Sequence, residues 1–67
     1  MAIISIQSKL IEAIDYDEDE KNLTIFLYNG ERRAYAGVSK GQVVGLTVAA
    51  SPGNYYMTEI RGKYPAL

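Results

Sequence analysis

The segment 22–28, Asn-Leu-Thr-Ile-Phe-Leu-Tyr, constrains the fold most, because it alternates as a β-strand does and is followed at once by Asn29-Gly30. Leucine and isoleucine at every second position would face one side of a sheet. The bulky residues between them predict some cover on the other side as well. Asn-Gly favours a type I′ hairpin turn, since both central residues of that turn have positive φ. We therefore expect an antiparallel return strand over residues 31–37.

The segments before this hairpin extend it into a small antiparallel meander. Residues 9–16 predict a strand, with Leu10, Glu12, Ile14 and Tyr16 on one face and the residues between them on the other. The charged run 17–22 is typical of a turn. The apolar stretch within residues 1–7 is a candidate fourth strand at the edge, where pairing with another copy would protect it.

The second half of the chain predicts one or two helices. Ser39-Lys40-Gly41-Gln42 fits a capping box, in which Gln42 reaches back to the serine. Val43, Leu46, Thr47 and Ala50 then share one helix face. Ser51-Pro52 predicts the start of a second helix over residues 53–60, and Gly62 fits its C-cap. The expected fold is α+β: an antiparallel meander of about three strands, with a candidate N-terminal edge strand, packed against one or two C-terminal helices.

Length and composition exclude several classes of protein. The 67 residues make a single domain, 1–67, and contain neither cysteine nor histidine. A single chain can therefore form no disulfide, no zinc site of the usual kind and no Ser-His-Asp triad. We expect no enzyme, no metal and no cofactor. Oligomerisation is the common remaining source of stability for so short a chain. No apolar run has the length of a membrane span and the N-terminus does not fit a signal peptide, so we expect a cytoplasmic protein that contacts no membrane.

The charge is distributed unevenly along the chain. Residues 1–31 carry two positive and seven negative side chains, and residues 32–67 carry five positive and one negative, for a net charge of −1. This balance lacks the overall basic field of a non-specific nucleic-acid binder, and no DNA partner is expected. Asp15, Asp17 and Asp19 alternate like a calcium loop, but Glu20 stands where the loop requires glycine, so a solvated turn is favoured.

The order of motifs over residues 7–65 resembles the KTSC family, a small domain found at the C-terminus of some lysyl-tRNA synthetases and as stand-alone bacterial and phage proteins. The resemblance rests on Tyr16-Asp17, Tyr35-Ala36-Gly37-Val38, Ala50-Ser51, Gly53-Asn54-Tyr55-Tyr56, Ile60-Arg61-Gly62 and Tyr64-Pro65. The family's usual centre is Tyr-x-Tyr, and the first of these positions is Arg33 here. A guanidinium can also stack on a base. The resemblance implies a nucleotide-type ligand.

Tyrosines and arginines together make the candidate site. Any single tyrosine is more often a rim residue of the core, with its hydroxyl in water. As a set, however, tyrosine rings and guanidinium forks are the means by which proteins hold nucleotides. Ser51 and Asn54 stand at the start of the second helix, where backbone N–H groups can meet an anion. The expected ligand-binding residues are Arg33, Tyr35, Ser51, Asn54, Tyr55, Tyr56, Arg61 and Lys63.

Three functions remain open. The first is non-catalytic binding of a small nucleotide by a homo-oligomer with pockets at its subunit interfaces. The ligand would be a cyclic dinucleotide, for example, and a phage protein of this kind would sequester a host signal. Seven cations suit a compact ligand better than a long polyanion. The second is an RNA-binding accessory module, as the synthetase context implies. The third is a protein-interaction or structural module that uses the N-terminal edge.

Overall fold

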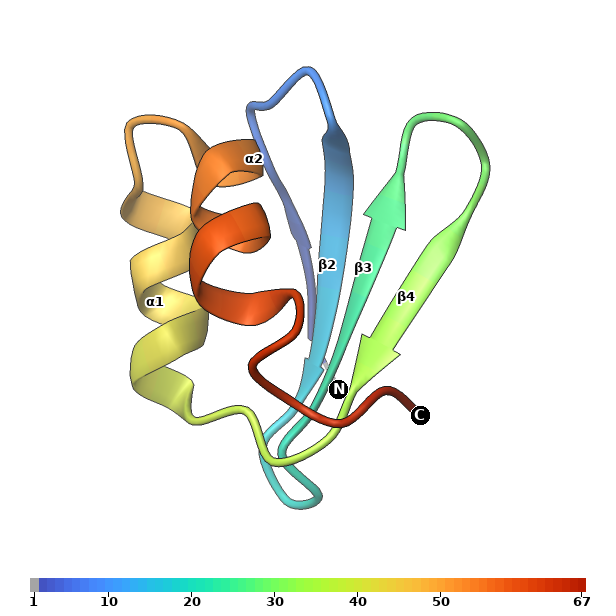
Figure 1. The fold of residues 1–67 in the computed structure, drawn as a ribbon, viewed down its shortest axis with the longest axis vertical. Helices are drawn as coiled ribbons and strands as arrows, with labels where there is room; N and C mark the ends of the chain where they lie inside the picture. Colours follow the sequence, from blue (N-terminus) through green and yellow to red (C-terminus); the bar gives the residue numbers. More distant parts are fainter. Residues whose placement is uncertain (1) are drawn as a thin grey trace.

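The structure, a computed structural model, describes residues 2–67 (Figure 1). Four strands precede the helices, which confirms the α+β class. The elements in chain order are β1 (Ala2–Ser5), β2 (Ile11–Asp17), β3 (Asn22–Leu27), β4 (Arg32–Tyr35), α1 (Lys40–Val48), α2 (Pro52–Tyr55) and η1 (Tyr56–Ile60), the last being one turn of π-helix.

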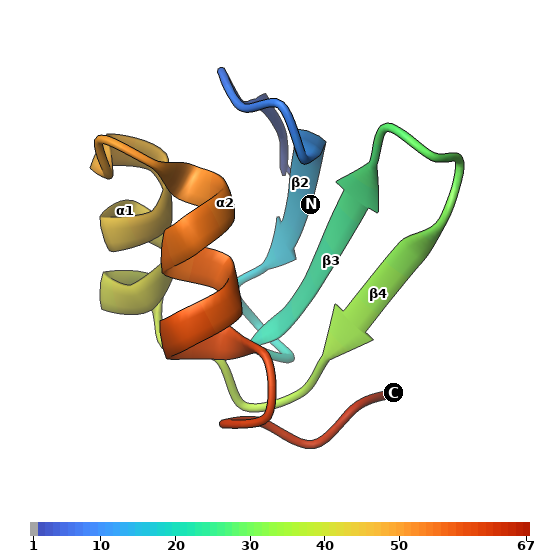
Figure 2. The ribbon, with the colours of Figure 1, turned by 45° about the horizontal axis from the view of Figure 1, so that its top comes forward.

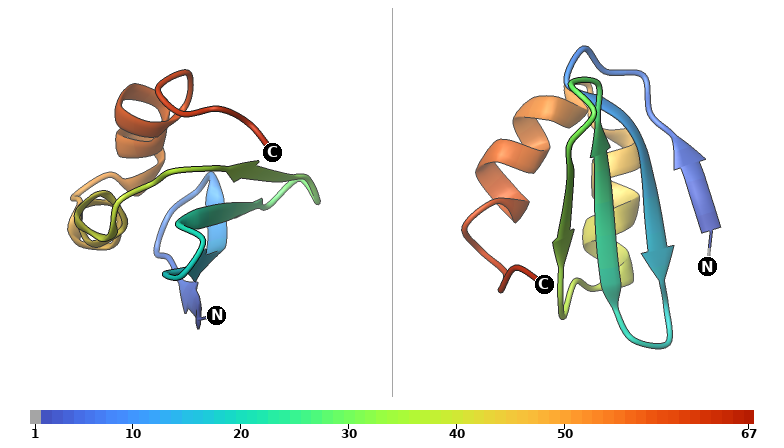
Figure 3. Two further views of the ribbon diagram at one scale, coloured as in Figure 1. Left: turned by 90° about the horizontal axis from the view of Figure 1, so that it is seen from below. Right: turned by 90° about the vertical axis from the view of Figure 1, so that its right-hand side faces the viewer.

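The strands form one antiparallel sheet in the order β1-β2-β3-β4, as the right view of Figure 3 shows. The candidate edge strand is thus present, and Met1 of the segment 1–7 lies outside the described residues. At the opposite edge the C-terminal residues cover β4. The N–H of Ala36 donates to the carbonyl of Pro65 at 3.0 Å, and the N–H of Leu67 donates to the carbonyl of Ala34 at 2.9 Å. The β1 edge has no such cover from residues 2–67.

A bulge in β2 changes the face that the sequence predicts for Ile11. Ile11 pairs with Leu27, but Ala13 pairs with Phe26, so the register shifts between them. The extra residue rotates the strand. Ile11 therefore joins Ile14 in the core instead of facing the opposite side, and strict alternation over this strand is wrong.

The hairpin after β3 is confirmed, but its turn is not type I′. Only Gly30 of the Asn-Gly pair has positive φ, at 89°. The N–H of Gly30 donates to the carbonyl of Leu27 at 3.1 Å, and the N–H of Leu27 donates to the carbonyl of Glu31 at 2.9 Å. This pattern encloses three residues and fits a turn followed by a left-handed glycine. The Asn29 side chain caps the loop by accepting from the N–H of Glu31 at 2.9 Å.

Both helical segments pack on the same face of the sheet, and α1 lies beside α2 and η1 (Figures 2 and 3). No helix within residues 2–67 covers the second face of β3, where the sequence predicts some cover. Thr24 and Phe26 on that face are only half-buried. Within residues 2–67, every helix is too short or too polar to cross a membrane.

Helix α1 begins as predicted and ends early. The Ser39 hydroxyl accepts the N–H of Gln42 at 3.4 Å. The Gln42 side chain does not reach back to the serine, however, because it accepts a hydrogen bond from the Tyr55 hydroxyl instead. Val43 and Leu46 are buried as expected, whereas Ala50 lies beyond the end of the helix and is exposed.

The predicted helix 53–60 is α2 and η1 together. Ser51 holds the N-cap position, but its side chain makes no capping bond. At the other end the N–H of Arg61 donates to the carbonyl of Tyr56, five residues back, at 2.8 Å. This wider turn is a π-helix. Gly62, with φ of 79°, ends the segment as expected of a C-cap glycine.

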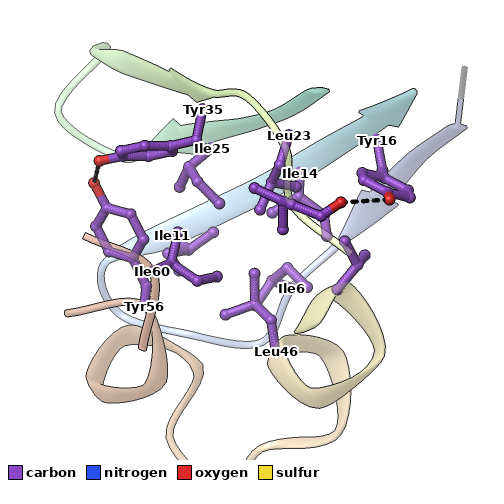
Figure 4. Packing of buried hydrophobic residues seen from close by; sticks show 12 residues of the cluster. Ile6, Ile11, Ile14, Tyr16, Leu23, Ile25, Tyr35, Leu46, Tyr56 and Ile60 are labelled. Carbon is purple, nitrogen blue, oxygen red and sulfur yellow. Dashed lines mark hydrogen bonds between the residues drawn. The ribbon is translucent and has the colours of Figure 1, made fainter. Parts of the chain in front are cut away.

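The core lies between the sheet and the helices (Figure 4). Tyr16 enters it from β2, and its hydroxyl donates to the buried carbonyl of Val38 at 2.6 Å. The buried hydrophobic residues are Ile6, Ile11, Ile14, Tyr16, Leu23, Ile25, Tyr35, Val38, Val43, Leu46, Tyr56 and Ile60.

Candidate functional site

A groove of about 890 Å³ lies between the β3–β4 hairpin and the segment α2–η1. The loop 7–10 closes one end, and Ala66 of the C-terminal tail also lines it. Its volume falls within the range of small-molecule sites. Six of the eight predicted ligand-binding residues line this groove, although they come from three separate segments. They are Arg33, Tyr35, Ser51, Asn54, Tyr56 and Arg61.

Tyr35 from β4 and Tyr56 from η1 meet, as Figure 4 shows, and both residues line the groove. Their hydroxyl oxygens are 2.7 Å apart, and their rings meet edge to face with centroids 6.0 Å apart. Only 6 % of Tyr35 and 4 % of Tyr56 are exposed. The rings therefore belong to the core and cannot offer their faces to a base.

Burial and, to a lesser extent, the hydrogen bond to Tyr35 raise the pKa of Tyr56, the positive charges of Arg61 and Arg33 lower it, and the net result is a pKa of about 12. Both guanidiniums thus act on the same hydroxyl. Because the pKa stays far above neutrality, Tyr56 keeps its proton at physiological pH.

The two groove arginines are held differently. The Arg33 guanidinium contacts the Glu31 carboxylate at 2.7 Å, and both side chains are largely exposed. Within residues 2–67 the Arg61 guanidinium donates only to the sulfur of Met57, at 3.6 Å. An exposed ion pair is weak and exchanges readily for another anion. Both guanidiniums are therefore available to an anionic ligand.

The family model for the KTSC domain matches residues 7–64. The chain belongs to the KTSC domain family. A crystal structure of a KTSC domain protein from Yersinia pestis superposes with a TM-score of 0.91 at 26 % identity, covering 98 % of this chain and 93 % of that one. A search of curated proteins finds no match.

Two predicted residues of the KTSC domain lie outside the groove. Tyr55 packs between the helices, where its ring contacts Gly45 and its hydroxyl donates to Gln42. This is the structural role that a single tyrosine most often has. Lys63 is exposed beyond the end of η1 and does not line the groove.

Sequence reasoning missed several residues that line the groove. Glu31 stands two residues before Arg33, so strand alternation alone would have placed both on one face. Lys9 and Leu10 precede β2, and antiparallel pairing brings that end of β2 next to the hairpin loop. Met57 lies one turn before Arg61 on the same helical segment. Leu10 and Met57 give the groove apolar surface, since they are 39 % and 46 % exposed.

A second, smaller hollow of about 420 Å³ lies at the opposite side of the domain. Ile4, Val43 and Val44 give it an apolar floor, and Glu18 pairs with Lys40 at 2.8 Å on its rim. The adjacent turn is a hydrogen-bonded loop in which the Asp17 carboxylate accepts from the N–H groups of Asp19 and Glu20. Among residues 2–67 no three acidic side chains gather as a metal site requires.

Proposed function

We propose that this KTSC domain is a non-catalytic binding protein for a small nucleotide ligand and that the groove between the β3–β4 hairpin and η1 is its site. The observation that carries the proposal is the meeting of two guanidiniums and a buried hydroxyl pair at one groove of about 890 Å³. Arginine forks and hydroxyl donors are the groups that bind phosphate oxygens most directly.

The charges of the groove support a compact anion. Its charged residues are Lys9, Glu31, Arg33 and Arg61, three positive and one negative, on a chain whose net charge is −1. A ligand with two phosphodiester groups, such as a cyclic dinucleotide, would neutralise this local excess. Base contact would come from the Arg33 plane and from the apolar surface of Leu10 and Met57, because the tyrosine rings are buried.

RNA binding, the second candidate, has weaker support. Outside the groove the chain has four cationic side chains, Lys21, Arg32, Lys40 and Lys63, and Lys40 is already paired with Glu18. A long RNA needs several phosphate contacts, and each one steepens the dependence of affinity on salt. The RNA candidate thus predicts affinity that falls steeply with salt, whereas a small ligand in the groove predicts a shallow dependence.

The proposal includes a homo-oligomer, and the bare β1 edge supports a dimer. The N–H of Ile6 donates to the carbonyl of Glu12 at 3.2 Å, and bonded pairs alternate along an antiparallel ladder, so Ile3 and Ser5 direct their backbone groups outward. A two-fold axis at Ile4 would pair Ile3 of one copy with Ser5 of the other. The edge carries none of the charged residues or prolines that usually prevent such pairing, and Ile3 is 73 % exposed.

Pairing at β1 leaves the groove free, because β1 and the groove-lining β4 lie at opposite edges of the sheet (Figure 3). Each chain already forms the groove by itself. A pocket shared between subunits would therefore need a second contact between the copies, in addition to pairing at β1. The dimer test is the mass in solution. Ile3→Lys is expected to give a monomer, and Thr58→Lys, which adds the same charge at an exposed position of η1, should keep the wild-type mass. A monomeric wild type would contradict the oligomer part of the proposal.

The binding test is a thermal-shift panel of cyclic dinucleotides, linear dinucleotides, mononucleotides and a short RNA. A ligand at one hundred times its Kd adds about 2.7 kcal/mol, which is roughly 10–20 °C for a domain of this size. Arg61→Ala should abolish the shift, and Lys63→Ala, two residues further and outside the groove, should not. If no nucleotide raises the melting temperature and RNA binds, the proposal is wrong.

Sequestration without chemistry is tested separately. The domain is incubated with a cyclic dinucleotide, then denatured, and the ligand is recovered by chromatography. A sponge returns the ligand intact and in the amount bound. Recovery of a linear or hydrolysed product that requires Arg61 would instead identify an enzyme.

A further inference from the structure

The hydroxyl pair of Tyr35 and Tyr56 has one hydrogen more than it uses. Two hydroxyl groups carry two hydrogens, and the 2.7 Å bond between them uses one. Neither hydroxyl makes another hydrogen bond within residues 2–67. Both residues are more than nine-tenths buried, and both line the groove, where an acceptor for the unused hydrogen could sit.

The surroundings of this hydrogen favour a negatively charged acceptor. Arg33 and Arg61 line the same groove as the two tyrosines, so an acceptor in the groove would lie among cationic groups. Glu31 is the one carboxylate of the groove, and it is already engaged with Arg33. Tyr56 keeps its proton at neutral pH, so it can act as a neutral donor.

We infer that the unused hydroxyl hydrogen of the Tyr35–Tyr56 pair, together with the Arg33 and Arg61 guanidiniums, forms a subsite for one phosphate oxyanion. This inference rests on the proposed function and names the part of the groove that holds a phosphodiester of the ligand. A buried hydroxyl donor and two forked cations match the several acceptor oxygens of a phosphate, whereas an uncharged nucleoside would leave the cations unpaired.

The shared bond makes an unusual prediction about substitutions. In Tyr35→Phe the bond between the hydroxyls is lost, so the Tyr56 hydrogen becomes free to donate to the oxyanion. In Tyr56→Phe the Tyr35 hydrogen does the same. Either single variant should therefore keep phosphate binding within about 3-fold of the wild type. The double variant Y35F/Y56F has no donor and should lose about 10- to 100-fold, as expected for a hydrogen bond to a charged acceptor.

The experiment is calorimetric titration of the wild type and these three variants with cyclic di-AMP, with inorganic phosphate and with uncharged adenosine. Tyr16→Phe is the matched control, because it removes a buried hydroxyl that bonds to Val38 and lies outside the groove. We expect binding of the two anions to survive each single change and to fall only in the double variant. Binding of adenosine should be unaffected.

The outcomes separate the subsite from the proposed function. Phosphate binding that falls only in the double variant, without cyclic di-AMP binding, supports the subsite and contradicts the nucleotide proposal. Cyclic di-AMP binding that needs Arg61 but is equal in all tyrosine variants overturns the subsite alone. If either single variant loses as much anion affinity as the double variant, the subsite is also overturned. If the wild type binds neither phosphate nor cyclic di-AMP, both the subsite and the nucleotide proposal are overturned.

A spectroscopic measurement covers the case in which the double variant does not fold. In the wild type, titration with phosphate should move the ring ¹³Cζ resonances of Tyr35 and Tyr56 together and leave that of Tyr16 in place. If phosphate binds while the Tyr35 and Tyr56 resonances stay fixed, the subsite is wrong.

Discussion

Gly45 is the position where a single methyl group should matter most for how the helices pack. It lies within α1, facing Tyr55 of α2, and a Cβ atom there would come within 2.9 Å of the Tyr55 Cζ and closer still to its hydroxyl. Contacts of that length do not occur between unbonded carbon atoms, so the Tyr55 ring must move. Its hydroxyl is bonded to Gln42, so the movement also breaks that hydrogen bond.

Three effects set the expected change in the free energy of unfolding for Gly45→Ala. Alanine is favoured over glycine within a helix by about 1 kcal/mol. Insertion of a methyl group into a packed contact costs about 1–3 kcal/mol, and loss of the Tyr55–Gln42 bond costs about 0.5–1.5 kcal/mol. The net expectation is destabilisation by roughly 0.5–3.5 kcal/mol, which lowers the melting temperature by about 2–28 °C.

The control is Gly41→Ala on the same helix, where an added Cβ meets only the Ser39 hydroxyl, at 3.9 Å. That variant gains helix propensity without a clash and should be more stable than the wild type. The assay is urea unfolding followed by circular dichroism. If Gly45→Ala is stabilised as much as Gly41→Ala, the close contact between the helices does not exist and the reasoning is refuted.

Three other predictions concern stability. Tyr16→Phe leaves the buried Val38 carbonyl unpaired and should cost about 1–3 kcal/mol in urea unfolding, and an unchanged midpoint would contradict the bond. Because the pKa of Tyr56 rises from 10.0 to about 12 on folding, the unfolded chain loses this proton first, so the contribution of Tyr56 to stability should be constant below pH 10 and fall as the pH rises toward 12. Unfolding curves between pH 10 and 12 test this, since the stability of Tyr56→Phe should fall less steeply with pH than that of the exposed control Tyr28→Phe. Gly62→Ala places a side chain at φ of 79° and should cost about 1–2 kcal/mol, whereas Gly62→Asn should cost less; equal stability of Gly62→Ala and wild type would show that the left-handed turn is not needed.

The sequence predicts the elements well where local chemistry decides them. Ser39 caps α1 and Gly62 ends η1, because a side-chain oxygen and a left-handed glycine act on their own neighbours in the chain. The bulge in β2 was not predictable, since it places Ile11 in the core through pairing with a strand more than ten residues away. The type of hairpin turn was wrong for a related reason: Asn-Gly allows two turns, and the register of β3 and β4 selects one.

The candidate site was predicted by residue type more than by geometry. Six of eight residues share the groove, yet the role expected of the tyrosines changes. Composition cannot tell a ring that faces a ligand from one that packs in the core, as Tyr35 and Tyr56 do. Tyr55 was indistinguishable from Tyr56 in the sequence, and one position along a helix turns a side chain by about 100° and so separates their neighbourhoods.

The C-terminal tail has a practical consequence for any study of ligand binding. Residues 65–67 hydrogen-bond along β4, and Ala66 borders the groove. A purification tag or reporter appended after Leu67 would emerge beside the proposed entrance, where it can obstruct access or add its own charges. A fluorophore in the same place would instead sense occupancy directly. Attachment ahead of β1 puts the appended group at the far edge of the sheet, so a matched pair of fusions at the two ends gives a built-in comparison for every affinity measured.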